Sequence, residues 1–289
     1  MNSGSLRIFC TVADYESVTQ AAIQLRRAPS NVTTKIKQLE SDLGVELFIR
    51  TGKKMKLASS GRKFYEYAQQ LLALENEARQ AIMGESIGGQ LIIGSMESTA
   101  ASRLPSVLSE YNIAYPTTNI SLTTGTSMQL LEKVSNGELD CAFLALPDVF
   151  DNDKALVELG INTQEVWSEE LLLLVPISEK KTSNFKDIKV RNLVSFHKGC
   201  TYREIAENIL NVNSSIDWKI HEMSSYHAMA AYVASGMSVT VLPKSVLDLM
   251  DLPASISYLR IKESKTLIIW RKEFDVPAFK NFLKLLTKR

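Results

Sequence analysis

Residues 26–40, RRAPSNVTTKIKQLE, decide the fold of the N-terminal part of the chain. Val32, Ile36 and Leu39 recur at intervals of four and three residues, which is the spacing of one buried face of a helix. The opposite face carries short hydroxyl and amide side chains, where a helix that meets only water usually carries Glu and Lys. We therefore expect this face to contact another molecule.

Local signals bound this helix and the one before it. Ser17 and Gln20 are spaced as in a capping box, and they predict the start of a second helix after a first one near residues 6–13. Pro29 suits the first position of the third helix, because its missing N–H is not needed there. Gly44 suits the end, since glycine readily adopts the left-handed conformation that closes a helix.

The pattern then changes from helices to short strands. Apolar and polar residues alternate over 45–49 and 55–57, on either side of the segment TGKK at 51–54, which predicts a hairpin with a basic turn. Helices followed by a hairpin are the order of a winged helix-turn-helix. A long helix is expected over 60–83, and it has too little to pack against alone, so we expect it to pair with a second copy of the chain.

Charge is unevenly distributed along the 289 residues. Residues 1–63 hold 11 Lys and Arg against 5 Asp and Glu, a net charge of +6, whereas the remainder carries −5 and the whole chain +1. A basic end joined to a mildly acidic body favours a module that binds a polyanion such as nucleic acid.

Composition excludes several other classes of protein. The strongest apolar run, LLLLVPI at 171–177, is too short to cross a membrane and contains a proline. The N-terminus lacks the pattern of a secretory signal. Three cysteines at wide spacing do not form a disulfide framework and suit a reducing compartment. We therefore expect a cytoplasmic protein without a membrane partner.

The rest of the chain predicts an α/β fold. Apolar strands near 91–94, 120–122 and 139–146 alternate with helices, which predicts parallel strands. A second set of strands and helices begins at 171–175 and ends with a strand near 266–270 and a helix at 277–288. Two α/β lobes with a cleft between them are the simplest arrangement.

These patterns divide the chain into three parts. They are a DNA-binding domain at 1–59, a linker helix and hinge at 60–87, and a ligand-binding domain at 88–289, whose lobe I is expected at about 88–163 with 271–289 and lobe II at about 164–270.

Polar residues gather where the predicted strands end. In parallel α/β lobes ligands bind beyond these ends, against the starts of helices. Lys198 and Arg203 would add positive charge and Glu97 would oppose it, so a carboxylate or other anion is favoured, although plain helix capping explains each hydroxyl equally well. The candidate ligand-binding residues are Ser95, Met96, Glu97, Ser98, Thr99, Gly125, Thr126, Ser127, Ala145, His197, Lys198, Gly199, Cys200, Thr201 and Arg203.

No constellation of residues predicts an enzyme. His197 and Cys200 could form a thiol–imidazole pair, but they equally suit two unrelated residues of a pocket. The histidines lack metal spacing, and no phosphate-binding glycine motif is present, so no metal or cofactor is expected. Cys200 could also sense oxidation, because the neighbouring Lys198 and His197 could lower its pKa.

The N-terminal third resembles the DNA-binding and linker segment of LysR-type transcriptional regulators. The resemblance lies in LRIFCTVADYESVTQAAIQL from Leu6 and SNVTTKIKQLESDLGVELFIRTGKKMKLASSGRKFYEYA from Ser30. Looser matches follow in order, among them NGELD at 136–140 and ASGMSVTVLP at 234–243. The resemblance implies a winged helix-turn-helix, a dimerising linker helix and a domain similar to type 2 periplasmic binding proteins.

The resemblance also places the DNA contacts. The family's base and backbone contacts come from the start of the third helix, here Pro29, Ser30, Thr33 and Thr34, while Arg50 and Lys53 match phosphate contacts at the wing. The family often has Gln in place of Pro29 and Arg in place of Thr34, so the base preference differs. With the outer face of the helix and the wing, the candidate DNA-binding residues are Pro29, Ser30, Asn31, Thr33, Thr34, Lys35, Lys37, Gln38, Arg50, Lys53 and Lys54.

The implied function is a sequence-specific transcriptional regulator controlled by a small-molecule effector. Its expected partners are double-stranded promoter DNA, the effector, RNA polymerase if it activates, and further copies of itself in a homodimer or homotetramer. Two alternatives stay open: a ligand-independent DNA-binding repressor with a vestigial cleft, and a two-lobed solute-binding protein with a helical adaptor.

Overall fold

The computed structural model describes residues 1–52, 54–83, 89–146, 153–182 and 184–287. These residues form two compact units. One is Met1–Gly84, and the other comprises Glu85–Ser135 and Leu139–Arg289.

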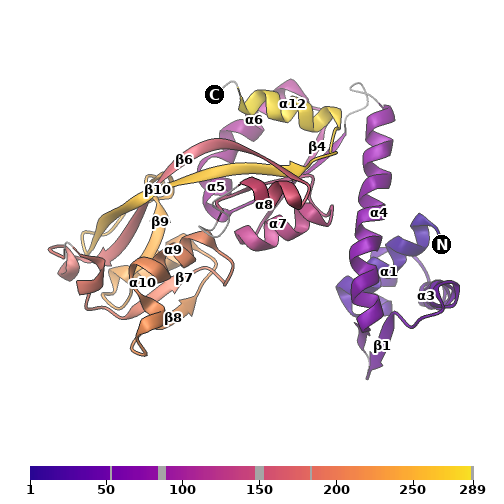
Figure 1. The fold of residues 1–289 in the computed structure, drawn as a ribbon, viewed down its shortest axis with the longest axis horizontal. Helices are drawn as coiled ribbons and strands as arrows, with labels where there is room; N and C mark the ends of the chain where they lie inside the picture. The colour runs from indigo at the N-terminus through magenta and orange to yellow at the C-terminus, as the bar shows by residue number, and fades with distance from the viewer. Residues whose placement is uncertain (53, 84–88, 147–152, 183, 288–289) are drawn as a thin grey trace. The chain divides into compact units, whose positions relative to one another are not determined.

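The N-terminal unit has the element order expected for a winged helix-turn-helix (Figure 1). Ser17 caps the second helix, Pro29 begins the third, and Gly44 adopts a φ of 69° at its end, as the sequence predicts. The strands of the hairpin begin at Phe48, three residues later than expected. The elements are α1 Ser3–Tyr15, α2 Val18–Gln24, α3 Pro29–Leu43, β1 Phe48–Thr51, β2 Lys54–Leu57 and α4 Ser59–Met83.

The third helix is fixed both by its apolar face and by one carboxylate. Val32, Ile36 and Leu39 are buried in the core of the unit. One residue further on, Glu40 Oε1 accepts hydrogen bonds from the backbone N–H groups of Leu47 at 2.9 Å and Phe48 at 3.2 Å. Because Phe48 begins β1, this carboxylate connects α3 directly to the hairpin.

The long helix α4 carries two apolar faces. Phe64, Ala68 and Leu72 pack against the core of the N-terminal unit. A second stripe, which we call the α4 stripe, runs beside this face at intervals of three and four residues and is exposed. Its members are Tyr67, Leu71, Leu74, Ala78 and Ile82.

The second unit is an α/β domain, as predicted (Figure 1). Its first half contains β3 Gln90–Ser95, α5 Glu97–Ser102, α6 Leu104–Ala114, β4 Asn119–Thr124, α7 Ser127–Ser135, β5 Cys141–Leu144, α8 Asp153–Glu158 and β6 Ile161–Pro176. Its second half contains β7 Asn192–Ser195, α9 Thr201–Ile209, β8 Lys219–Glu222, α10 Tyr226–Ala234, β9 Thr240–Pro243, α11 Lys244–Leu247, β10 Ile256–Arg271 and α12 Pro277–Leu286, with short 3-10 turns at Ile177–Glu179, Phe185–Asp187 and Val212–Ser214.

Two long antiparallel strands distinguish the structure from the expected succession of short ones. A six-stranded sheet has the order β4-β3-β5-β10-β6-β9, in which β3, β4 and β5 are parallel as expected. β6 and β10 are 16 residues long and pair antiparallel. The sequence shows only their apolar parts, 171–175 and 266–270, because the middle of each strand is polar.

The two long strands join the lobes. Leu267–Trp270 of β10 pairs with β5 of lobe I, whereas Leu171–Leu174 of β6 pairs with β9 of lobe II. The expected lobe boundaries at 164 and 271 therefore lie within strands that both lobes share. Register shifts interrupt the β6–β10 pairing between Arg260 and Glu263 and between Thr266 and Leu267, where the strands pass from one lobe to the other.

Candidate functional sites: the outer face of α3 and an interlobe cavity

The face of α3 opposite the core is open to solvent. Among the predicted DNA-binding residues of this helix, Thr33 and Lys35 are partly exposed and the others are exposed, namely Pro29, Ser30, Asn31, Thr34, Lys37 and Gln38. The hydroxyl of Thr34 donates to Ser30 O at 2.9 Å, and that of Thr33 donates to Pro29 O at 3.0 Å. Each hydroxyl proton is therefore used inside the helix, which leaves an accepting oxygen and a methyl group for an outside partner.

The hairpin adds cations beside this helix. Arg50 and Lys54 are exposed, and Lys53 lies outside the described residues. Lys54 Nζ is 3.4 Å from Glu16 Oε2, so part of its charge is compensated within the unit. A groove of about 420 Å³ separates α3 from the hairpin, and Thr33, Lys37 and Arg50 are among the residues that line it.

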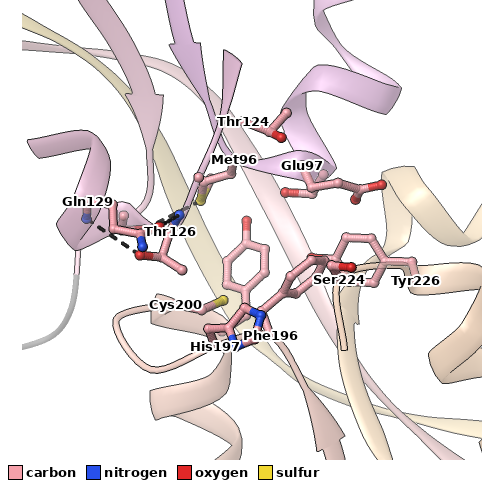
Figure 2. Close-up of a pocket in the computed structure, with 14 residues that line it drawn as sticks. Met96, Glu97, Thr124, Thr126, Gln129, Phe196, His197, Cys200, Ser224 and Tyr226 are labelled. Carbon is pink, nitrogen blue, oxygen red and sulfur yellow. Dashed lines mark hydrogen bonds between the residues drawn. The ribbon is translucent and has the colours of Figure 1, made fainter. Parts of the chain in front are cut away.

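A cavity of about 220 Å³ lies between the two lobes of the second unit, and we call it the interlobe cavity (Figure 2). It forms where β3 and β4 of lobe I and β7 and β8 of lobe II end. The volume is below the range of about 300–1,000 Å³ that is usual for drug-sized ligands. Lobe I contributes Met96, Glu97, Ser98, Thr124, Gly125, Thr126, Ser127 and Gln129, and lobe II contributes Phe196, His197, Cys200, Tyr202, Ser224 and Tyr226.

Other predicted ligand-binding residues build the wall behind this cavity. Thr201 Oγ1 lies 2.6 Å from Ala145 O and 3.0 Å from Ser127 Oγ, so the start of α9 is hydrogen-bonded to lobe I. Gly199 O accepts from the N–H of Met128 at 3.3 Å. Gly199 has a φ of +94°, and a Cβ there would stand 3.1 Å from Thr126 Oγ1, so only glycine suits this approach. Ser95 and Thr99 are buried and do not line the cavity.

The two cations expected at the site do not line it. Lys198 is exposed on the loop after β7. Arg203 is bound by two carboxylates, with Nε 2.7 Å from Glu207 Oε1 and Nη1 2.6 Å from Glu222 Oε1. The expectation that Lys198 and Arg203 make the site positive is therefore wrong, because lobe II compensates one of them and turns the other to solvent.

Comparisons with known proteins agree with this arrangement of domains. Residues 4–62 match the family model "Bacterial regulatory helix-turn-helix protein, lysR family", and residues 84–289 match "LysR substrate binding domain". The transcriptional regulator GltR of Bacillus subtilis is 33% identical over 290 residues, covering 98% of this chain and 95% of that protein. SoxR of Arthrobacter sp. is 32% identical and covers 99% and 96%.

The chain belongs to the LysR family of transcriptional regulators.

Solved structures show the same fold for this LysR-type regulator. A full-length variant of OxyR from Pseudomonas aeruginosa has a TM-score of 0.70 at 21% identity, covering 99% of this chain and 94% of that one. CbnR complexed with its target DNA has a TM-score of 0.67 at 24% identity and covers 100% and 99%. The structures confirm the predicted winged helix-turn-helix and effector-domain architecture, and membership of the family confirms the predicted role as a DNA-binding regulator.

The lining of the cavity includes residues that the sequence analysis of this LysR-type regulator missed. Thr124 and Ser224 are polar residues at strand ends, as Ser95 and Thr126 are. The same criterion could therefore have predicted them as ligand-binding residues. Tyr202 and Tyr226 lie on the buried faces of α9 and α10 and resemble ordinary core residues. The remaining missed residues are Gln129 and Phe196.

Cys200 does not have the environment of a reactive thiol in this LysR-type regulator. Burial raises the pKa of the Cys200 thiol, and the nearby backbone N–H groups of Arg203 and Tyr202, together with the Arg203 charge, offset this only in part. The expectation that its neighbours lower the pKa is therefore wrong. His197 instead places Nδ1 2.8 Å from Glu222 Oε2, so the thiol–imidazole pair is not supported.

No group of three or more His, Cys, Asp or Glu in the described part of the chain could hold a metal ion. No helix there is long and apolar enough to cross a membrane.

Proposed function

We propose that this regulator inserts α3 into the major groove of promoter DNA and lays the β1–β2 hairpin along the phosphate backbone. The observation that carries the proposal is the outer face of α3, which is exposed and polar while its other face is buried. Hydroxyl and amide groups both donate to and accept from base edges, and lysines neutralise phosphates. Pro29 and Thr34 stand where the family often has Gln and Arg. We therefore expect sequence recognition by α3 to depend more on threonine methyl groups, Lys35 or Lys37, and DNA shape than it does in other members of the family.

The α4 stripe supports assembly from identical subunits. Tyr67 is 56% exposed, Leu74 62% and Ile82 86%, which is unusual for large apolar side chains in a regular row. Pairing this stripe with its copy would bury it and set two α3 helices at a fixed spacing. The resulting homodimer, or a homotetramer of two such dimers, would recognise a partly palindromic operator.

The interlobe cavity supports control by a small effector. A ligand that contacts both lobes stabilises one arrangement of them and shifts the assembly toward the state that fits it best. An organic acid suits the lobe I side, where Thr126, Ser127 and Gln129 stand at the start of α7 and the positive end of the helix dipole favours an anion. The protein would act in the cytoplasm beside its DNA and would contact RNA polymerase where it activates transcription.

Two measurements test the proposal. In a footprint of the promoter next to its own gene, the protein should protect a partly palindromic site. Protection should weaken by at least about a hundredfold between roughly 50 and 200 mM salt. Absent protection, or protection that does not respond to salt, would contradict DNA binding of this kind.

A thermal-shift screen tests the effector. Organic acids, amino acids and aromatic carboxylates should include at least one compound that raises the melting temperature of the full-length protein. If no compound does so, a ligand-independent repressor with a vestigial cleft becomes the better explanation.

A further inference from the structure

The charged residues that line the interlobe cavity are not those of an anion site. Glu97 is the acidic side chain in the lining, and neither lysine nor arginine is among the described residues that form it. His197 is the one basic candidate in this described lining, and its Nδ1 is 2.8 Å from Glu222 Oε2. Glu97 is therefore the side chain of this described lining that can carry negative charge into the cavity, and in its ionised form it would repel a ligand whose only charge is a carboxylate.

One buried carboxylate oxygen of this cavity, on Glu97, has no hydrogen-bond partner among the described residues. This atom, Glu97 Oε2, is inaccessible to water, whereas the Tyr202 hydroxyl has Ser98 and Thr266 as hydrogen-bonding neighbours. A buried polar group without a partner costs about 1–3 kcal/mol, and more when it is charged. Glu97 lines the interlobe cavity, so a ligand with hydrogen-bond donors would offset part of this cost.

The remaining walls suit a cation. Phe196, Tyr202 and Tyr226 place three aromatic rings around the cavity, and aromatic faces attract ammonium groups. Figure 2 shows Glu97 and Ser224 on one side of the view, and Thr126 and Gln129 on the other. The acid-accepting start of α7 and the carboxylate of Glu97 therefore lie at different places on the wall.

We propose that the effector carries a protonated amine that pairs with Glu97, and hence that it is an amino acid or a related amine-bearing acid rather than a simple carboxylic acid. The inference rests on the proposed function, since it names the ligand class of the same cavity. Burial raises the pKa of Glu97, with His227 opposing this, and an ammonium group beside the carboxylate would favour its ionised form. His227 is exposed and does not belong to the described lining of the cavity.

Two sets of compounds with matched carbon skeletons test the proposal. The first is pentanoate, L-norvaline, 5-aminopentanoate and pentylamine. The second is 3-phenylpropanoate and L-phenylalanine. Dissociation constants are measured by calorimetry on the full-length protein, on Glu97→Gln and on Glu132→Gln, which makes the same change at an exposed carboxylate of α7 outside the lining.

In wild type, the best amine-bearing member of at least one set should bind at least about tenfold more tightly than the acid without an amine. Glu97→Gln should lose most of this preference, and Glu132→Gln should keep it. Circular dichroism and operator binding of Glu97→Gln show whether the variant is folded.

Each contrary outcome separates the two proposals. If pentanoate and 3-phenylpropanoate bind as tightly as the amine-bearing members of their sets, or more tightly, the effector does not need an amine. The same follows if Glu97→Gln keeps the full preference for the amine. Either result would overturn the proposed amine and leave effector binding intact. If neither these compounds nor any acid of the thermal-shift screen binds, both the amine and the effector-binding function are overturned.

Discussion

Thr201 Oγ1 at the start of α9 lies 3.0 Å from Ser127 Oγ at the start of α7. The two helices belong to different lobes, and both residues are almost completely buried. The same threonine oxygen is 2.6 Å from Ala145 O, directly after β5. The lobes are therefore joined by polar groups at the back of the interlobe cavity, where a ligand that draws the lobes together would act on them.

Thr201→Val should destabilise the effector domain by about 1–3 kcal/mol, because it keeps the shape of the side chain but leaves Ala145 O and Ser127 Oγ short of a partner. Urea unfolding followed by tryptophan fluorescence measures this domain alone, since Trp167, Trp218 and Trp270 all lie in it. Thr117→Val, at an exposed turn, is the matched control and should be nearly neutral. Equal stability of the two variants would show that the hydroxyl of Thr201 is not important for lobe contact.

Thr34→Ser should reduce, by about 1 kcal/mol, the discrimination between the operator and an operator in which the contacted thymine is replaced. Thr34→Val should keep most of this discrimination. The hydroxyl proton of Thr34 is already donated to Ser30 O, so the methyl group is the better candidate for the contact that distinguishes the bases. Electrophoretic mobility shifts with both DNA sequences measure the difference. The opposite ranking of the two variants would assign the reading to the hydroxyl oxygen.

Arg50→Ala should weaken binding to all DNA sequences to a similar degree and lower the salt dependence by about one unit of slope, as expected for the loss of one phosphate contact. Arg50 is exposed at the end of β1, beside the groove that Lys37 also lines. Fluorescence anisotropy over a salt series measures both quantities. A loss confined to the operator would instead indicate that Arg50 reads a base.

Leu74→Glu should convert the assembly to smaller species, because it places a charge in the centre of the α4 stripe, where pairing would bury it. Leu74 is 62% exposed in the isolated chain, so the substitution should not disturb the fold of the subunit itself. Sedimentation velocity measures the change. Glu66→Lys, an exposed charge reversal on another face of α4, should leave the assembly unchanged.

Glu97→Gln should remove one component of the pH dependence of stability. Because burial raises the pKa of Glu97 above its usual 4.5, the folded protein prefers the protonated form, and this contribution is complete below pH 4.5 and lost as the pH rises through the folded pKa. The variant should therefore match wild type at the acidic end and be more stable at neutral pH without ligand. Unfolding measured across this range at matched pH values checks the sign; a variant less stable at pH 7 would contradict it.

Most of the N-terminal unit could be predicted because its signals are local. Ser17, Pro29 and Gly44 bound their helices by backbone chemistry that needs no distant partner, and Val32, Ile36 and Leu39 mark the buried face by spacing alone. The parallel strands β3, β4 and β5 were also predicted, since each is a short apolar run between helices. The role of Glu40 was not, because its partners Leu47 and Phe48 lie seven and eight residues away across a turn.

Tertiary structure decided the parts that depend on distant pairing. The polar centres of β6 and β10 become strands only because each pairs with the other across about 90 residues of sequence, and this pairing joins the lobes. Arg203 is charged in any sequence-based prediction, yet Glu207 and Glu222 compensate it and keep it from the cavity. The sequence by itself therefore determined a winged helix joined to two α/β lobes. The charge of the ligand-binding cavity depends on which distant side chains the fold brings together. In this fold Glu97 lines the cavity, and the described lining contains no lysine or arginine.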